Sequence, residues 1–191
     1  MGYTPQIISE IKDGRINFEN NTFDLVLCNQ VFEHIGDIDS VLLEINRVLK
    51  PNGYMFCIFP PKDVFIEWHV GIPFIHWLPK RSTFRYLLTL FFRTLGFGFN
   101  KEKSSRIKWT LDKLWYLEEF TFYRSVKNVI STFSKFFNVN ILKLNSFNTK
   151  FELRGISGKV YQILRIRLLL NIFTLFQNHW NLIIIASKKG L

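Results

Sequence analysis

The sequence predicts an α/β protein built around a parallel sheet, and three features of its first third indicate this fold class. Residues 23–28 form a short, almost continuous apolar run between polar residues, which is typical of a strand buried on both faces of a parallel sheet. Residues 38–49 repeat apolar side chains at helical spacing, and residues 54–59 form a second apolar run. A strand, a helix and a strand in this order predict two parallel strands joined by a right-handed crossover.

The predicted helix has favourable residues at both ends. Asp37 suits the N-cap, because its carboxylate can accept hydrogen bonds from the free amides of the first turn. Lys50 suits the negative end of the helix dipole, and Pro51 blocks further helix. Asn52 and Gly53 supply the backbone freedom for a turn into the next strand. The apolar face expected to pack on the sheet consists of Ile38, Val41, Leu42, Ile45, Val48 and Leu49.

The flanking segments predict further elements. Upstream, residues 4–12 suit the end of a helix and residues 15–18 a remnant of a strand. Downstream, Ser125 can cap a helix whose apolar face reaches residue 137. Residues 139–144 alternate as a strand, and residues 180–187 form another apolar strand.

Two motifs carry a resemblance to a known family. The run Phe23-Asp24-Leu25-Val26 is followed by Glu33-His34, and the helix ends in Arg47-Val48-Leu49-Lys50-Pro51-Asn52-Gly53. These residues resemble the fourth strand, the following helix and the fifth strand of class I S-adenosylmethionine-dependent methyltransferases, of the methyltransferase type 11 kind. The resemblance implies a Rossmann-like sheet that ends in an antiparallel strand pair, and S-adenosylmethionine as the cofactor.

The glycine-rich turn that holds the cofactor in this family has no counterpart before Phe23. Gly96-Phe97-Gly98 follows an aromatic segment with no strand in front of it, so we interpret it as a loop. The chain therefore resembles the C-terminal portion of such a domain. Either Met1 is an internal methionine of a longer protein, or the chain is a naturally shortened relative. We favour the first, because strand 23–28 would otherwise be a bare hydrophobic edge, and we expect this chain alone to bind S-adenosylmethionine weakly or not at all.

The resemblance divides the chain into three regions. Residues 1–61 form part of the cofactor-binding core, residues 62–124 form a helical cap that reaches the substrate, and residues 125–191 complete the core. An insert at residues 145–179 is long for a connection between two antiparallel strands. We expect this helical insert to join residues 62–124 over the mouth of the active site.

Cofactor contacts are predicted at the ends of the strands, because ligands of open α/β sheets bind beyond the carboxyl ends. In the resembling family, the end of strand four approaches the methionine part of the cofactor, and an acidic residue after strand three reaches the adenine. This implies cofactor contacts from Asp13, Cys28, Asn29 and Gln30. The alternative for Asn29 and Gln30 is a polar strand end without a ligand.

The acceptor side of the site is predicted from two segments that contain histidine. Residues 67–79 resemble a segment that follows strand five in a subset of these methyltransferases, and Glu33-His34 follows strand four. An imidazole can take a proton from an acceptor, while carboxylates and indoles can orient it. The candidate bases are His34, His69 and His76, and the candidate substrate contacts are Glu33, Glu67, Trp68 and Trp77.

No metal site is predicted from these residues. The spacing of Glu67, His69 and His76 is loose for a metal-binding motif. In some quinone-biosynthesis methyltransferases that the Glu33-His34 motif resembles, acidic residues and a histidine here bind a metal or contact the substrate, but Gln30 stands where a further acid would favour a metal. A structural or lid role is the alternative for residues 67–79. A hydrogen-bond network at the start of a helix is the alternative for Glu33 and His34.

Positive charge is concentrated after residue 60. Residues 1–60 carry a net charge of −4 and residues 61–191 carry +14. Such a field attracts anionic partners, including lipid headgroups and nucleic acid. Residues 81–99 and 159–177 are apolar with interspersed arginines, which favours either core packing or an interfacial membrane helix. Neither segment offers the roughly 18 uninterrupted apolar residues of a membrane-spanning helix. Residues 101–124 mix cations with aromatic residues, but no recognised nucleic-acid motif is present.

The predicted function is methyl transfer to an oxygen, nitrogen or carbon atom of a small-molecule or lipid-linked acceptor. The alternative is a non-catalytic module that binds a partner protein or an anionic membrane surface. Cys28 and Cys57 lie in predicted buried strands, so no disulfide is expected. The N-terminus lacks a basic-then-apolar signal pattern, which predicts a cytoplasmic location.

Overall fold

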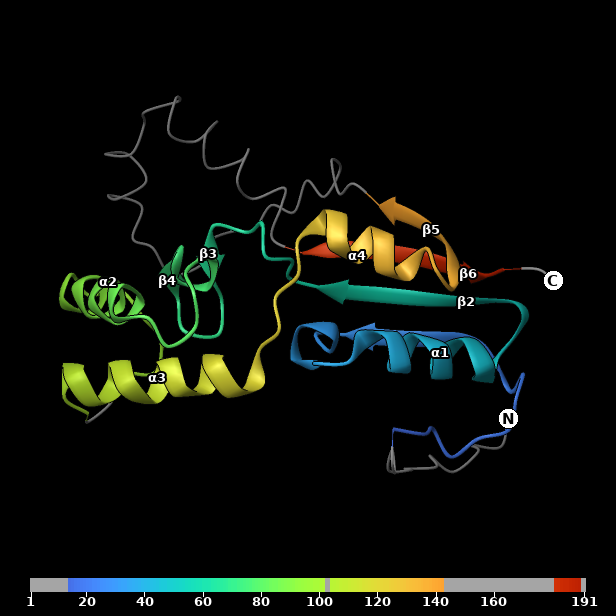
Figure 1. Ribbon diagram of the computed structural model, residues 1–191, viewed down its shortest axis with the longest axis horizontal. Helices are drawn as coiled ribbons and strands as arrows, with labels where there is room; N and C mark the ends of the chain where they lie inside the picture. Colours follow the sequence, from blue (N-terminus) through green and yellow to red (C-terminus); the bar gives the residue numbers. More distant parts are fainter. Residues whose placement is uncertain (1–13, 102–103, 143–180, 190–191) are drawn as a thin grey trace, which may run out of the picture.

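The protein contains a four-stranded mixed sheet flanked by helices (Figure 1). The computed structural model describes residues 14–101, 104–142 and 181–189. The strand order is β1-β2-β6-β5, in which β1 and β2 are parallel and the other two pairs are antiparallel. This arrangement confirms the predicted α/β class and the antiparallel strand pair at the end of the chain. The strands span β1 Phe23–Asn29, β2 Leu49–Phe59, β5 Phe137–Leu142 and β6 Leu182–Lys188.

Two helices, α1 Ile38–Val48 and α4 Val126–Phe133, share the main hydrophobic core with the sheet. Leu42 and Ile45 of α1 and Phe133 of α4 are almost completely buried there. The side chain of Asp37 accepts a hydrogen bond from the amide of Ser40, which confirms the predicted N-cap. Asn52 adopts a left-handed backbone conformation at φ 63°, as the predicted turn requires.

One expectation about β1 is wrong for the described chain, because this strand is buried on one face only. Cys28 faces the core, whereas Leu25 and Leu27 are 52% and 68% exposed. The described helices α1 and α4 cover one side of the sheet, and β1 is its edge strand in this part of the chain.

The described part of residues 62–124, which we call the cap, contains a second cluster of buried apolar residues (Figure 1). It contains a two-stranded sheet, a 3-10 turn and two helices that pack on each other. Its own core is centred on Ile72, Trp109 and Leu117. The elements are β3 Ile66–Glu67, β4 Ile72–Pro73, η2 Ile75–Trp77, α2 Thr83–Thr94 and α3 Arg106–Phe120.

The helix expected within residues 81–99 is shorter, because it ends at Thr94 before Gly96. Residues 96–98 form a loop, as predicted, and the ring of Trp109 lies against Gly98. Residues 15–18 form only an isolated bridge and bends rather than a strand. No helix in the described ranges is long and apolar enough to cross a membrane. The predicted helix end at 4–12 and the inserts at 145–179 and 159–177 lie outside the described residues.

Candidate functional site

The carboxyl ends of β1 and β2 meet the cap at a cavity of about 340 Å³. Gln30 follows β1 with φ 53°, and its backbone amide donates to the carbonyl of Ile58 on β2. The Gln30 side chain donates to Asn181, which directly precedes β6. The residues that line the cavity are Gln30, Pro60, Trp68, His69 and Asn181. Three strand ends and the cap therefore border one opening.

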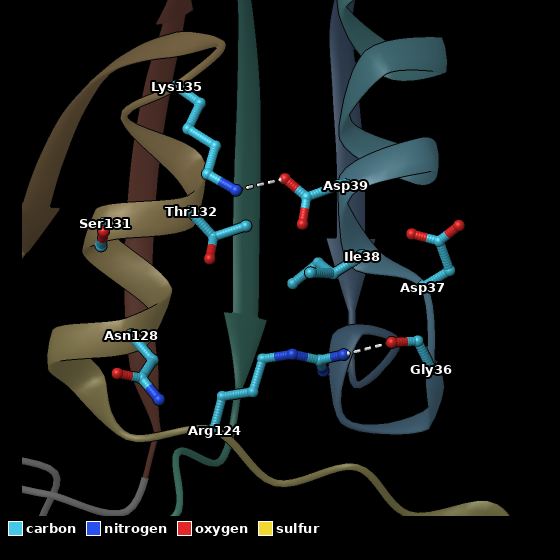
Figure 2. Close-up of a pocket in the computed structure, with 9 residues that line it drawn as sticks. All are labelled: Gly36, Asp37, Ile38, Asp39, Arg124, Asn128, Ser131, Thr132 and Lys135. Carbon is cyan, nitrogen blue, oxygen red and sulfur yellow. Dashed lines mark hydrogen bonds and ion pairs between the residues drawn. The ribbon is translucent and has the colours of Figure 1, made fainter.

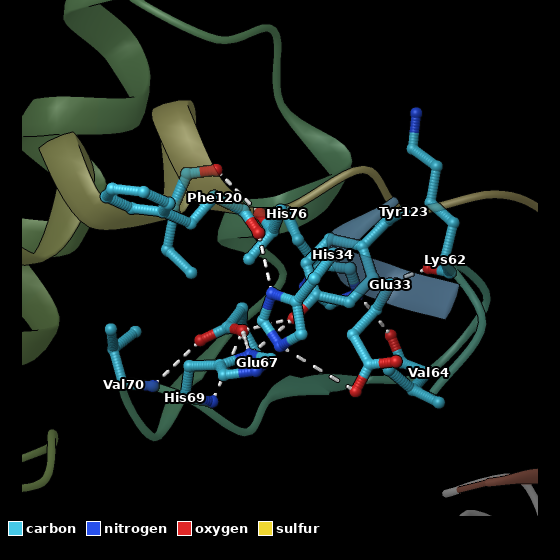
Figure 3. A network of polar contacts seen from close by, with 12 residues as sticks. Glu33, His34, Lys62, Val64, Glu67, His69, Val70, His76, Phe120 and Tyr123 are labelled. Carbon is cyan, nitrogen blue, oxygen red and sulfur yellow. Dashed lines mark hydrogen bonds and ion pairs between the residues drawn. The ribbon is translucent and has the colours of Figure 1, made fainter. Parts of the chain in front are cut away.

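His69 is held in this wall by a buried carboxylate, that of Glu67 (Figure 3). The Nδ1 atom of His69 donates to Oε1 of Glu67 over 2.7 Å, and Tyr123 donates its hydroxyl proton to the same oxygen. The other oxygen of Glu67 accepts from the amide of Val70 at 2.8 Å. Burial opposes ionisation of Glu67, but the hydrogen bonds from His69 and Tyr123 outweigh it, so the pKa of Glu67 is lowered. The hydrogen bond to Glu67 raises the pKa of His69.

Glu33 and His34 lie in the 3-10 turn η1, Phe32–His34, directly after β1. Nδ1 of His34 is 2.6 Å from the carbonyl oxygen of Phe120 in the cap. The Glu33 side chain is 1% exposed, and neither carboxylate oxygen has a hydrogen-bond partner. Burial accordingly raises the pKa of Glu33.

These two segments converge, although they are far apart in sequence. Ligand-capable atoms of Glu33, His34 and His69 all lie within 4.8 Å of one another. The imidazole rings of His34 and His69 are edge to face with centroids 5.1 Å apart. Two of the predicted bases and one predicted substrate contact thus form a single cluster.

The remaining histidine and tryptophan of the cap segment mainly hold the loop after β2. Nε2 of His76 donates to the carbonyls of Lys62 and Val64 at 3.1 and 2.9 Å, and His76 is buried. Burial lowers the pKa of His76. The indole nitrogen of Trp77 donates to the carbonyl of Lys62 at 2.7 Å. These contacts attach His76 and Trp77 to the loop after β2, and neither residue lines the cavity at the strand ends.

The predicted cofactor residues differ in their exposure to solvent. Asn29 and Gln30 are exposed at the end of β1, whereas Cys28 is buried beside Cys57. Asp13 lies outside the described residues. Of the four, Asn29 and Gln30 therefore have side chains available to a ligand in this part of the chain.

Sequence reasoning missed Tyr123, Arg124 and Asn181, whereas Pro60 lies at the predicted strand end. The guanidinium of Arg124 donates to the carbonyls of Ile35 and Gly36, each at 2.7 Å, and to that of Phe32 at 3.2 Å. This ties the end of the cap to the turn that carries Glu33 and His34. No sequence pattern marked Tyr123, Arg124 or Asn181, because their roles depend on long-range contacts.

A second cavity, of about 390 Å³, lies between the start of α1 and α4 (Figure 2). Its two cations are already engaged, since Lys135 is paired with Asp39 at 2.7 Å and Arg124 donates to Gly36. Charge pairing of this kind leaves little to attract a ligand. The cavity at the strand ends is the stronger candidate.

Comparison with known proteins finds similarity mainly in the first part of the chain. Residues 6–57 match the family model described as a methyltransferase domain. An uncharacterized methyltransferase of Schizosaccharomyces pombe is 44% identical over 43 residues, which are 22% of this chain and 16% of that protein. A demethylmenaquinone methyltransferase of Symbiobacterium thermophilum is 32% identical over 73 residues, covering 34% of this chain and 29% of that protein.

A ubiquinone/menaquinone biosynthesis C-methyltransferase of Desulfotalea psychrophila is 33% identical over 69 residues, covering 32% of this chain and 28% of that protein. These matches span less than a third of the length of each relative. Among solved structures, a putative S-adenosylmethionine-dependent methyltransferase from Listeria monocytogenes is similar, with a TM-score of 0.49 and 17% identity. That alignment covers 98% of this chain and 72% of the other.

Proposed function

We propose that this chain, whose residues 6–57 belong to the methyltransferase domain family, contributes to methyl transfer onto a small-molecule acceptor held at the ends of β1 and β2. The observation that carries the proposal is the position of the cavity. It lies beyond the carboxyl ends of two adjacent parallel strands, where open α/β sheets bind ligands.

S-adenosylmethionine is the methyl donor of this family and, when bound, supplies an electrophilic methyl group. Asn29 and Gln30 fit a polar ligand, because both side chains are exposed where β1 ends. We assign them the methionine end of the cofactor. Asp13 stays a proposed contact to the adenine, and Cys28, which is 8% exposed, stays a proposed contact to the methionine part.

The acceptor would lie against Trp68 and His69. Glu67 fixes the orientation of the His69 ring, and this leaves Nε2 to act on the acceptor. The lone pair of Nε2 can remove a proton from the acceptor. Because the donor is already activated, the main task of these residues is to align the two reactants.

Two relatives named above are quinone-pathway methyltransferases, so a demethylmenaquinol is the first acceptor to test. A quinol is planar and aromatic, and the aromatic residue Trp68 is one of those that line the cavity. A lipid tail on such an acceptor would also agree with the exposed apolar residues of α2, described below.

The site assignment can be tested by titrating the chain with S-adenosylhomocysteine while recording amide NMR spectra. We expect weak binding, with the largest shifts at Asn29 and Gln30. Asn29→Ala should weaken the binding further, and Asn138→Ala, at an exposed position of β5, serves as the matched control. Shifts centred on the second cavity, around Asn128 and Lys135, would overturn the assignment.

A second candidate function is docking on an anionic membrane surface. Along α2 and just beyond it, large apolar side chains recur at helical spacing and are more than half exposed: Phe84, Leu87, Phe91 and Leu95. An exposed stripe of this kind, in a basic part of the chain, favours interfacial binding. Peripheral docking would suit a cytoplasmic protein with a lipid-linked acceptor.

Sedimentation with vesicles containing phosphatidylserine tests this candidate. We expect Phe91→Glu to reduce the bound fraction strongly. Thr94→Glu, an equally charged change at the exposed end of the same helix, should have a smaller effect. Equal binding by both variants would exclude the apolar stripe as the docking surface.

A further inference from the structure

The cluster of Glu33, His34 and His69 contains hydrogen-bond acceptors without a donor. A carbonyl oxygen can only accept, so the Nδ1 atom of His34, 2.6 Å from the Phe120 carbonyl, carries the proton. In a neutral His34, Nε2 then carries a free lone pair. It lies 4.0 Å from Oε1 of Glu33.

The protonated nitrogen of His69 is assigned in the same way. Its Nδ1 atom donates to the carboxylate of Glu67, so Nε2 of the neutral ring carries a second free lone pair. The two rings face each other edge to face beside Glu33 (Figure 3). Each histidine thus uses one nitrogen for the fold and has the other available to a ligand.

Glu33 gives independent evidence for a ligand. Its side chain is almost fully buried, yet neither carboxylate oxygen accepts a hydrogen bond in the described chain. A buried carboxylate without donors is costly, and a positive charge placed between it and the two imidazoles would remove that cost.

We propose that Glu33, His34 and His69 bind one divalent transition-metal cation of the Zn²⁺ class. Two imidazole nitrogens and one carboxylate are a common ligand set for such ions, whereas Mg²⁺ prefers oxygen ligands. Glu67 would then be the outer carboxylate that orients His69, an arrangement that recurs around metal-bound histidines.

The cluster has nearly the right size for this ion. Ligand atoms of a tetrahedral zinc site lie roughly 3.3 Å apart, given metal–ligand bonds of about 2.0 Å, whereas here they lie within 4.8 Å. His34 can move inward, because its side chain is 34% exposed. Three protein ligands leave a fourth position open. That position would hold an oxygen of the acceptor, a role that rests on the proposed function, although binding of the cation does not.

Zinc affinity of the metal-stripped 191-residue chain, measured by competition with a chromophoric chelator, tests the site. We expect one zinc ion per chain and tighter binding of Zn²⁺ than of Mg²⁺. Glu33→Gln and His34→Asn should each lower the affinity at least about 100-fold, and Glu67→Gln about 10- to 100-fold. Glu119→Gln, an exposed carboxylate on α3, is the matched control and should leave the affinity unchanged.

Thermal unfolding provides a second readout that needs neither cofactor nor acceptor. Without metal, Glu33→Gln should be at least as stable as the wild type, because it removes an unpartnered buried charge. With Zn²⁺, the wild type should gain stability and Glu33→Gln should not. The proposal is overturned by zinc affinities of Glu33→Gln and wild type within about threefold, by tighter binding of Mg²⁺, or by an equal zinc-induced stabilisation of both proteins.

Discussion

The sheet with α1 and α4 and the cap of residues 62–124 differ in how their sequences encode them. In the sheet, local signals decide the structure, since the N-cap Asp37 and the turn at Asn52 both act within a few residues. In the cap, contacts between distant residues decide it. His69 is oriented through Glu67, which is also held by Tyr123, a residue more than fifty positions away in the chain.

This difference explains why the proposed site lies where the two regions meet. The sheet supplies Glu33 and His34 at the end of β1, and the cap supplies His69. Neither region alone contains the whole cluster. Hydrogen bonds connect the η1 turn of the sheet region to three residues at the end of the cap, Phe120, Phe122 and Arg124.

The largest expected effect comes from the sheet core. Leu42 is fully buried between α1 and the strands, so Leu42→Ala should lower the free energy of unfolding by about 2–5 kcal/mol. Urea denaturation followed by circular dichroism measures this. Leu87→Ala, at an exposed position of α2, should stay within about 0.5 kcal/mol of wild type. A similar loss in both variants would contradict the assigned core.

The second-largest loss of stability is expected from breaking the contact between the sheet and the cap. Arg124→Ala removes the guanidinium that donates to the carbonyls of Phe32, Ile35 and Gly36 and should cost about 2–3 kcal/mol. Arg124→Lys should recover only part of this, because an ammonium cannot reproduce the planar fork. The variants should also show faster amide hydrogen exchange in the η1 turn. Unchanged exchange there would show that the cap is held by other contacts.

The sheet region and the cap also differ in how well their structures could be predicted from the sequence. Residues 23–59 were predicted closely, because apolar periodicity, a capping aspartate and an Asn-Gly turn are all local signals. The predicted histidine cluster was only a set of separate candidates. Its convergence depends on how the cap folds back onto β1, and sequence spacing does not contain that information. The one-sided burial of β1 was missed for a related reason, since a strand pattern does not tell which layers cover it.

A substitution at Gly98 should destabilise only the cap. Gly98 has φ +100°, and a Cβ there would lie 2.6 Å from the ring of Trp109. Gly98→Ala should therefore destabilise the protein by about 2 kcal/mol. Gly96 is the matched control, because its φ is +95° but a Cβ would meet no atom within 4 Å. Gly96→Ala should cost only the backbone strain, about 1 kcal/mol, and equal losses would mean that the contact with Trp109 does not matter.

The smallest effect is expected where the cap ends and α4 begins. Ser125 caps α4 by accepting from the amide of Asn128 at 3.2 Å, and Asp63 of the cap accepts from Val126 at 2.6 Å. Ser125→Ala should cost about 1 kcal/mol, because one amide of the first turn loses its acceptor while Asp63 still serves the other. Ser131→Ala, an exposed change within the same helix, should be neutral or slightly stabilising. If Ser125→Ala is as neutral as Ser131→Ala, the start of α4 is fixed by Asp63, and the cap then determines where a helix of the sheet region begins.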